Sequence, residues 1–346
     1  MTQIQNVAIV SLSAGTLGEP FVQHELAIGV RRLEEMGLDV RFMPHALKGI
    51  DYVREHPEKR AADLLQALED PSIDMILCAI GGDDTYRLLP HLFGHDELAT
   101  AVASASHKVF LGFSDTTINH LMLHKVGRRT YYGQAFLADV CEIGKDMLPY
   151  TRRYFDELVQ TGTIRQVKPS DTWYESRSDF GPDQVGTPLV AHQNQGFKLL
   201  QGSPTFSGEV LGGCIDTFFD VFDAGRYADM PALCERYAIF PTKDDWTGRI
   251  LLLESSEEKM SPEAYRQTLT FLKEKGVFQA VSGILVGKPM DEANASEYER
   301  ALVDVIDDPS LPVVTNVNVG HAQPRCIIPF GPKARVDVCN QVICFD

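Results

Sequence analysis

Apolar and polar residues alternate along the first 130 positions in a pattern that changes period several times. Four short apolar runs are typical of buried strands: Val7–Val10, Val40–Met43, Met75–Ile80 and Lys108–Gly112. Between them, Phe21–Met36 carries apolar residues at helical spacing, and Lys59–Glu69 is also predicted to be a helix. This alternation of strands and helices predicts a parallel sheet covered by helices.

The second half of the chain, from about residue 196, repeats the strand signal. The predicted strands are Ile250–Leu253, Gly283–Val286, Pro312–Val317 and Ala334–Val338. Pro262–Lys275 is predicted to be a helix. The segment between the halves, from about Thr161 to Gln195, is polar, contains three prolines and shows little periodicity. Because long irregular segments in compact proteins are commonly functional or disordered, we interpret it as a linker and a loop over a cleft.

Length, charge and cysteine content narrow the class of protein. A chain of 346 residues exceeds one typical core, so two domains are expected. The net charge of −16 argues against a general nucleic-acid binder. We find no run of about 18 apolar residues and no basic region before the first strand, so neither a membrane span nor a signal peptide is predicted. The seven cysteines contain no CxxC pair, so we expect a cytoplasmic protein without a metal site.

Three polar segments follow apolar runs and together supply the groups of a serine hydrolase. They are Gly112–Thr117, Leu251–Glu254 and Gly320–His321. A serine hydroxyl is a weak nucleophile unless a histidine accepts its proton and a carboxylate orients the histidine. We therefore predict that Ser114, Glu254 and His321 act together to hydrolyse an amide bond.

Each of these residues also has an ordinary structural interpretation. Ser114 or Asp115 could cap the helix predicted at Thr117–Lys125, because both residue types suit that role. A carboxylate that ends a buried strand, such as Glu254, is commonly solvated. A histidine in a loop, such as His321, is commonly structural or exposed.

A second glycine-containing turn, Gly81–Thr85, follows another predicted strand. Its glycines allow a close approach of the backbone to a ligand and offer N–H groups for an oxyanion hole, although a tight turn capped by Asp84 or Thr85 is equally reasonable. The turn also looks like the Gly-Gly-Asp-Gly-Thr nucleotide-binding loop of the NAD kinase and diacylglycerol kinase families. Asp84 replaces the last glycine, and its carboxylate would repel phosphate. A nucleotide-dependent kinase is therefore the main alternative of another class.

Six stretches, taken together, resemble the LD-carboxypeptidase family of serine peptidases, and more closely its microcin C self-immunity (MccF-like) branch. They are Ala79–Pro90, Val109–Leu121, Tyr132–Gly133, Leu211–Asp216, Ile250–Glu254 and Val319–His321. The resemblance implies that Ser114 is the nucleophile, His321 the general base and later acid, and Glu254 its orienting carboxylate. It also implies an oxyanion hole made by backbone N–H groups of Gly82 and Asp115.

The resemblance further implies an α/β protein with two domains and an active site between them. Residues 1–160 would form an N-terminal parallel-sheet α/β domain that carries the nucleophile, 161–195 the linker and cleft loop, and 196–346 a smaller, β-rich C-terminal domain that carries the glutamate and the histidine. Relatives of this kind are usually homodimers. No metal or organic cofactor is implied.

Two substrates divide this family. One branch trims the terminal D-alanine of murein tetrapeptides in cell-wall recycling, and the other cleaves an amide between an aspartyl residue and a modified nucleotide. In the second branch a loop aromatic residue stacks on the nucleobase, and Trp173 is the candidate by position, although it could instead pack the loop onto the body. The sequence Gly81-Gly82-Asp83-Asp84 and the long segment at 161–195 favour this second branch. We expect a small peptide or peptidyl-nucleotide substrate held by Gly81, Asp83 and Trp173, and no nucleic-acid or membrane partner.

Overall fold

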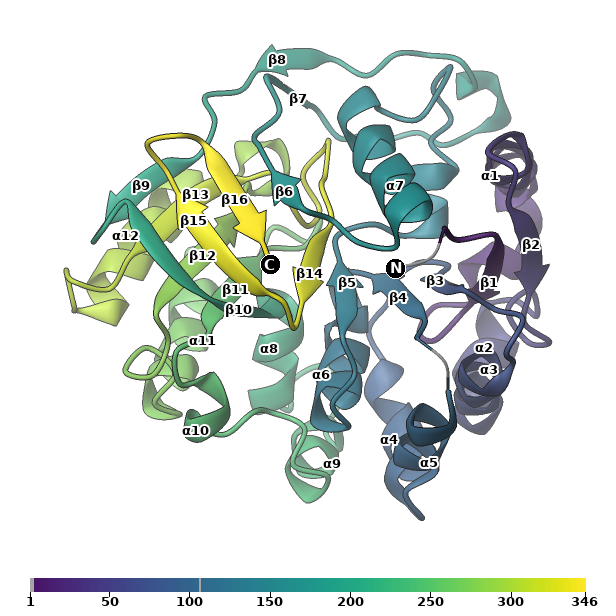
Figure 1. Ribbon diagram of the computed structural model, residues 1–346, viewed down its shortest axis with the longest axis horizontal. Coiled ribbons are helices and arrows are strands. Elements are labelled where there is room, and N and C mark those ends of the chain that lie inside the picture. Colours follow the sequence, from purple (N-terminus) through teal and green to yellow (C-terminus); the bar gives the residue numbers. More distant parts are fainter. Residues whose placement is uncertain (1–2, 106) are drawn as a thin grey trace. The chain divides into compact units, whose positions relative to one another are not determined.

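The computed structural model describes residues 3–105 and 107–346 (Figure 1). The chain forms two compact units of nearly equal length. Unit 1 comprises Met1–Thr163 and Arg177–Leu189, and unit 2 comprises Ile164–Ser176 and Val190–Asp346. The irregular segment at 161–195 is therefore divided between the two units.

Unit 1 is built on a parallel sheet. Its strands are β1 (Asn6–Val10), β2 (Asp39–Phe42), β3 (Met75–Cys78), β4 (Val109–Gly112) and β5 (Thr130–Tyr132). They lie in the order β5-β4-β3-β1-β2, and each is parallel to its neighbours. All residues of β3 and β4 are buried, because a strand in the middle of a helix-covered sheet has no face toward water.

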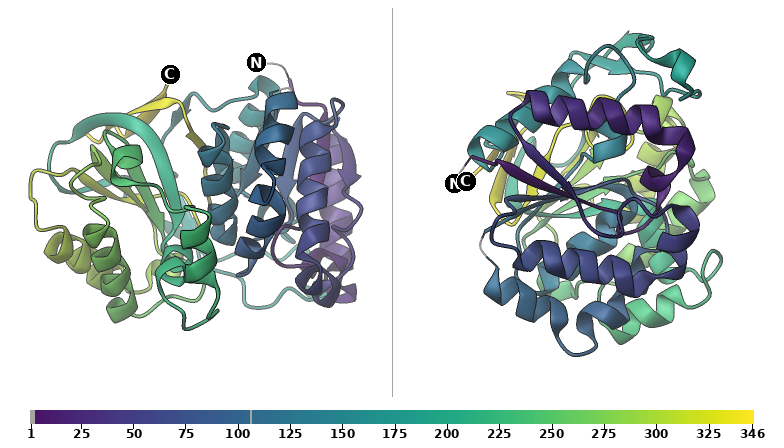
Figure 2. Two further views of the ribbon diagram at one scale, coloured as in Figure 1. Left: turned by 90° about the horizontal axis from the view of Figure 1, so that it is seen from below. Right: turned by 90° about the vertical axis from the view of Figure 1, so that its right-hand side faces the viewer.

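Helices cover both faces of this sheet. They are α1 (Gln23–Glu35), α2 (Ile50–Glu55), α3 (Pro57–Glu69), α4 (Leu89–Phe93), α5 (Glu97–Ser104), α6 (Thr117–Lys125) and α7 (Pro149–Thr161). The right-hand view of Figure 2 shows α1 on one face and α3 on the other. Short 3-10 helices precede several of them, at Thr16–Gly18, Pro20–Val22, Thr85–Leu88 and Ser114–Thr116, and Phe136–Val140 forms one π-helical turn.

Unit 2 is built on a mixed sheet. Its strands, in spatial order, are β6 (Gln166–Val167), β16 (Val342–Phe345), β15 (Lys333–Asp337), β10 (Thr205–Cys214), β11 (Ile250–Glu254), β12 (Gly283–Gly287), β13 (Val313–Val317) and β9 (Lys198–Gln201). The four strands β10 to β13 are parallel, and the outer strands are antiparallel to their neighbours. In β10 and β11, Cys214 is the register partner of Glu254, so two polar side chains end neighbouring strands.

The helices of unit 2 follow the parallel strands. They are α8 (Ile215–Phe222), α9 (Met230–Arg236), α10 (Lys243–Trp246), α11 (Pro262–Glu274) and α12 (Ala295–Ile306), with 3-10 turns at Pro182–Gln184 in unit 1 and Met290–Glu292 in unit 2. Two further strands, β7 (Thr172–Tyr174) and β8 (Ala191–Gln193), form a separate hairpin, and β14 (Ile328–Phe330) follows the loop after His321.

Local sequence explains where these helices begin. Pro57 and Pro262 stand at the first positions of α3 and α11, where the missing N–H has no intrahelical partner to lose. Ser261 caps α11 by accepting a hydrogen bond from the N–H of Ala264. The helix predicted at Pro262–Lys275 and the strands predicted from apolar runs are all present, and their bounds differ from the predicted ones by about one or two residues.

The predicted fold class, an α/β protein with a parallel N-terminal sheet and a β-rich C-terminal unit, is confirmed. The expectation of little regular structure at 161–195 is wrong in part, since β6, β7 and β8 lie there. These strands have only two or three residues each, so the sequence shows no apolar run or alternation that would predict them. In the described part of the chain, none of the helices has the length and apolar character needed to cross a bilayer.

Candidate active site

Ser114 lies at the sharp turn between β4 and α6. Its φ of 67° falls in the left-handed region that side chains seldom adopt. The turn is held by two hydrogen bonds: the N–H of Ser114 donates to the hydroxyl of Tyr132 at 3.1 Å, and the hydroxyl of Thr117 donates to the carbonyl of Ser114 at 2.7 Å. Strained backbone of this kind concentrates at active sites, because it presents one side chain in a fixed direction.

The two glycines that follow β3 are required by close neighbours. A Cβ on Gly81 would lie 2.6 Å from Cβ and 2.8 Å from Oγ of Ser114. Gly82 has a φ of 148°, and a Cβ there would lie 2.2 Å from Oγ of Ser13. The backbone of the Gly81–Thr85 turn therefore lies directly against the serine, at a distance that only glycine permits.

Asp115 connects the same two turns and does not act as a helix cap. Its buried carboxyl accepts hydrogen bonds from the hydroxyl of Ser13 at 2.6 Å and from the N–H of Thr85 at 2.9 Å. Burial raises the pKa of this carboxyl to about 7, although these two donors oppose the shift and the nearby charge of Asp84 reinforces it. The capping interpretation of Asp115 is therefore wrong: its side chain fixes the Gly81–Thr85 turn beside Ser114.

Asp84 is also a structural residue. It forms a buried ion pair with Arg60, whose two terminal nitrogens lie 2.6 and 3.3 Å from the carboxylate oxygens. Arg60 in turn donates to the carbonyls of Leu12 and Ser13. The carboxylate that the kinase alternative would turn toward phosphate is thus already neutralised within the core.

The Arg60–Asp84 pair yields a prediction about stability. Asp84→Asn keeps the shape of the side chain but leaves the Arg60 charge uncompensated, so we expect the free energy of unfolding to fall by about 3 kcal/mol. Urea denaturation measures this change. Asp51→Asn is the matched control, because it breaks an ion pair with Arg54 that is exposed and should cost less than about 1 kcal/mol. Equal effects in the two variants would contradict the assigned role.

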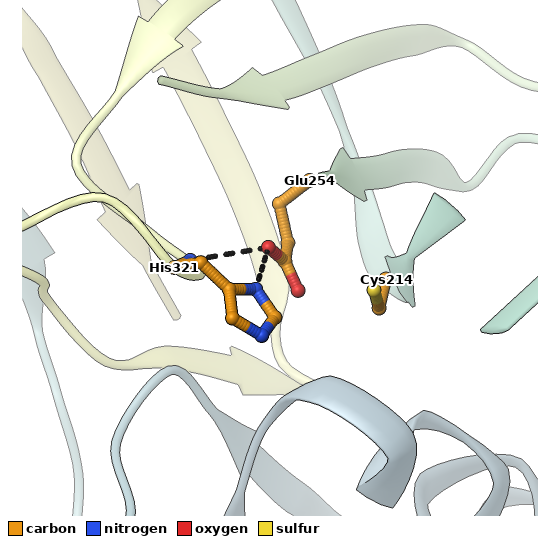
Figure 3. Close-up of side chains that lie close together, drawn as sticks. All are labelled: Cys214, Glu254 and His321. Atoms are coloured by element: carbon orange, nitrogen blue, oxygen red, sulfur yellow. Dashed lines mark hydrogen bonds and ion pairs between the residues drawn. The ribbon is translucent and has the colours of Figure 1, made fainter. Parts of the chain in front are cut away.

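Glu254 at the end of β11 and His321 in the loop after β13 form a hydrogen-bonded pair (Figure 3). Nδ1 of His321 lies 2.7 Å from Oε2 of Glu254, and the backbone N–H of His321 donates to the same oxygen at 3.1 Å. Glu254 is buried, and Gly320 leaves room for its carboxylate. The pair has the geometry of an orienting carboxylate that keeps the proton on Nδ1 and directs Nε2 outward.

A second carboxylate, that of Glu257, contacts the other ring nitrogen of His321. Oε2 of Glu257 lies 3.0 Å from Nε2. Burial would lower the pKa of His321, but the charges and hydrogen bonds of Glu254 and Glu257 outweigh it and raise this pKa to about 10. The hydrogen bond to His321 lowers the pKa of Glu257 to about 2. The end of the apolar run at Leu251–Leu253 indicates Glu254 but not Glu257, which lies three residues further along in a polar segment.

Cys214, Glu254 and His321 are the described residues whose ligand atoms lie close enough to hold a metal ion, all within 4.8 Å of one another. The facing atoms of Glu254 and His321 already share a hydrogen bond, which is the arrangement of a proton-transfer pair. Burial raises the pKa of the Cys214 thiol well above its ordinary value.

Trp173 lies on β7, opposite His192 on β8. The indole stacks on the His192 ring at a centroid distance of 4.4 Å, and Nζ of Lys288 lies over the indole at 4.9 Å. Unit 2 contains a cavity of about 610 Å3, a volume typical of small-molecule sites. Its lining includes Trp173, His192, Asn194, Lys288, Tyr298 and Asn316.

The structure therefore assembles the predicted residues in two groups. In unit 1, Gly81 and Asp115 adjoin Ser114, and in unit 2 Glu254 adjoins His321. Their union in one triad stays a prediction. The same holds for the oxyanion-hole roles of Gly82 and Asp115 and for substrate contacts of Gly81, Asp83 and Trp173.

Comparisons with known proteins match both halves of the chain to one family. Residues 7–133 match the LD-carboxypeptidase N-terminal domain, and residues 207–336 match the LD-carboxypeptidase C-terminal domain. The crystal structure of an MccF-like protein from Streptococcus pneumoniae in complex with AMP is 56% identical in sequence, with a TM-score of 0.97 and 99% of each chain covered.

Two curated relatives carry different names. The microcin C7 self-immunity protein MccF of Escherichia coli is 26% identical over 83% of this chain and 77% of its own length. A solved structure of MccF in complex with aspartyl sulfamoyl adenosine has a TM-score of 0.78 at 21% identity and covers 100% of this chain and 96% of that chain. A probable murein peptide carboxypeptidase of Bacillus subtilis is 24% identical over 89% of this chain and 83% of its own length.

Proposed function

This chain belongs to the LD-carboxypeptidase family of serine peptidases, and from that membership we propose that it hydrolyses an amide bond of a peptidyl-nucleotide through Ser114, Glu254 and His321. The observation that carries the proposal is the hydrogen bond between Nδ1 of His321 and the buried carboxylate of Glu254. That bond leaves Nε2 as the atom that receives a proton. The family also excludes the kinase alternative, in agreement with the burial of Asp84 against Arg60.

In the proposed reaction, Oγ of Ser114 attacks the carbonyl carbon of the amide while its proton passes to Nε2 of His321. Backbone N–H groups of Gly82 and Asp115 would stabilise the negative charge that develops on the carbonyl oxygen. The same proton then passes from Nε2 to the leaving nitrogen, and an acyl-enzyme remains on Ser114. Water, deprotonated by His321, hydrolyses this ester and restores the hydroxyl.

The nucleotide preference is supported by the hairpin of Trp173. An indole beside a cavity lined by amides and a lysine suits a base and a sugar, and the similar Streptococcus pneumoniae protein binds AMP. A base would stack on the indole in competition with His192 and Lys288. The alternative substrate, a murein tetrapeptide, is supported by the similarity to the Bacillus subtilis carboxypeptidase.

One experiment separates these substrates. The purified protein is incubated with an aspartyl-nucleotide amide or with a murein tetrapeptide, and the products are identified by mass spectrometry. We expect free aspartate and the amino-nucleotide from the first substrate. Release of D-alanine from the second alone would assign the chain to cell-wall recycling, and cleavage of neither by a folded protein would contradict the proposal.

Truncation of Trp173 tests the stacking directly. Because base stacking on an aromatic ring contributes about 1–3 kcal/mol, Trp173→Ala should lower kcat/KM for the aspartyl-nucleotide amide by roughly 5- to 150-fold. The murein tetrapeptide, which has no base, should be affected less than about 2-fold. Trp173→Phe is the matched control, since a smaller ring should retain part of the effect. Equal losses on both substrates would show that Trp173 only packs the hairpin.

A further inference from the structure

Both ring nitrogens of His321 are engaged by carboxylates, and the two carboxylates differ in their access to water. The Glu254 side chain is 0% exposed, whereas that of Glu257 is 62% exposed. Movement of Glu254 away from Nδ1 would leave a buried carboxylate without a partner. The cost of such an unpaired buried charge keeps Glu254 on Nδ1. Glu257 can leave Nε2, because water is available to solvate its carboxylate.

The residues on either side of Glu257 are held by hydrogen bonds and ion pairs. The N–H and hydroxyl of Ser256 donate to Asp216 at 2.9 and 2.8 Å, and Glu258 is paired with Arg226. Beyond it, Lys259 is paired with Asp291. Departure of the Glu257 carboxylate from Nε2 therefore needs only rotation of one side chain and no movement of the loop.

The contact with Glu257 conflicts with the base role of His321. A general base must have a lone pair on Nε2, and Nε2 in this arrangement carries a proton that it shares with Glu257. The serine hydroxyl and Glu257 also require the same direction of approach to Nε2. Both cannot hold this atom at once.

We propose that Glu257 is a gate on His321: it holds Nε2 in the resting enzyme and must rotate into solvent before the histidine can accept the proton of Ser114. The inference rests on the proposed function, because it concerns the same histidine. When the gate opens, the proton on Nε2 passes to water and leaves a neutral imidazole, whose Nε2 lone pair then receives the proton from Oγ of Ser114. Glu257 is thus a positioning residue that acts through His321.

Removal of the Glu257 carboxylate should lower the pH at which His321 is half protonated. The charged and titratable groups that face this histidine come from several elements: Cys214 from β10, Asp216 from α8, Glu254 from β11, Glu257 from the loop after β11 and Arg325 from the loop after His321. A Glu257→Gln variant keeps all of these groups except the Glu257 carboxylate. A shift of the His321 midpoint in that variant therefore reports the effect of this carboxylate alone.

The decisive measurement is an NMR titration of the histidine rings. Protein labelled with 13C at histidine Cε1, in a Ser114→Ala background that prevents turnover, is titrated from pH 5 to pH 10.5, and the signal of His321 is identified by its loss in His321→Gln. Since a charge-assisted hydrogen bond is lost, Glu257→Gln should lower the midpoint of His321 by about one to two pH units.

Glu258→Gln is the matched control. It removes the neighbouring carboxylate, which is exposed and bound to Arg226, and should move the midpoint of His321 by less than about 0.3 units. A midpoint of His321 that is the same in Glu257→Gln and the parent would overturn the gate. Circular dichroism confirms that both variants are folded, as expected for an exposed side chain.

A kinetic arm separates the gate from the proposed function. In Glu257→Gln, the acid limb of kcat/KM against pH for the aspartyl-nucleotide amide should move to lower pH. The shift should equal that of the NMR midpoint, because no carboxylate has to leave Nε2 in this variant. A shifted NMR midpoint with full activity in Ser114→Ala would support the gate and reject the triad. An unshifted limb in an enzyme that depends on Ser114 would support the triad and reject the gate.

Discussion

Ser114→Ala is expected to lower kcat by roughly ten-thousand- to a million-fold, with the fold unchanged. The substitution removes only Oγ, and without it no acyl-enzyme can form, so the remaining rate reflects binding and oxyanion stabilisation alone. Initial rates of aspartyl-nucleotide amide cleavage measure the loss, and thermal denaturation checks the fold. The backbone of the turn should persist, because its hydrogen bonds to Tyr132 and Thr117 use main-chain atoms of Ser114.

Two further variants make this prediction specific. Ser104→Ala, which removes a hydroxyl that donates to the carbonyl of Ala101 at the end of α5, should leave kcat unchanged. His321→Ala combined with Ser114→Ala should be little worse than Ser114→Ala alone, because the residues of a triad act as a unit. Losses that multiply, or a Ser114→Ala enzyme with a tenth of the parent rate, would remove Ser114 from the mechanism.

Gly320→Ala is expected to lower kcat by roughly a thousand-fold. A Cβ at this position would lie 2.2 Å from Oε2 and 2.4 Å from Cδ of Glu254, the carboxylate that orients His321. The backbone of Gly287 also lies close to Glu254, because a Cβ there would lie only 2.7 Å from Cβ of Glu254. The added methyl group must therefore displace the carboxylate, and a misplaced carboxylate leaves the histidine in the wrong tautomer or orientation.

Gly248→Ala is the control for the backbone strain that accompanies this substitution. Gly248 has a φ of 73°, close to the 87° of Gly320, but a Cβ there would meet no atom within 4 Å. Gly248→Ala should therefore lower the free energy of unfolding by about 1 kcal/mol without affecting kcat. If both variants retained full activity, Glu254 would not orient the catalytic base. If both lost it equally, strain alone would be the cause.

The apolar pattern was sufficient to predict most elements of the two sheets. Strands such as β3 and β11 are short, continuous apolar runs, and α11 is bounded by a serine cap and a proline. The hairpin of β7 and β8 was missed because each of its strands has only three residues, too few for an alternating pattern to be recognised. Trp173, a candidate by its position in the long insert, is the part of that hairpin that the sequence could indicate.

The order of serine, glutamate and histidine after three apolar runs was readable in the sequence, because the end of an apolar run marks where a buried strand stops. It was the folded chain that decided which polar groups meet there. Nothing in the local pattern pairs Arg60 with Asp84, places Gly81 against Ser114 or turns Glu257 toward Nε2 of His321. Periodicity records which side of an element is buried, whereas the partner of a buried side chain is chosen by packing between segments distant in the sequence.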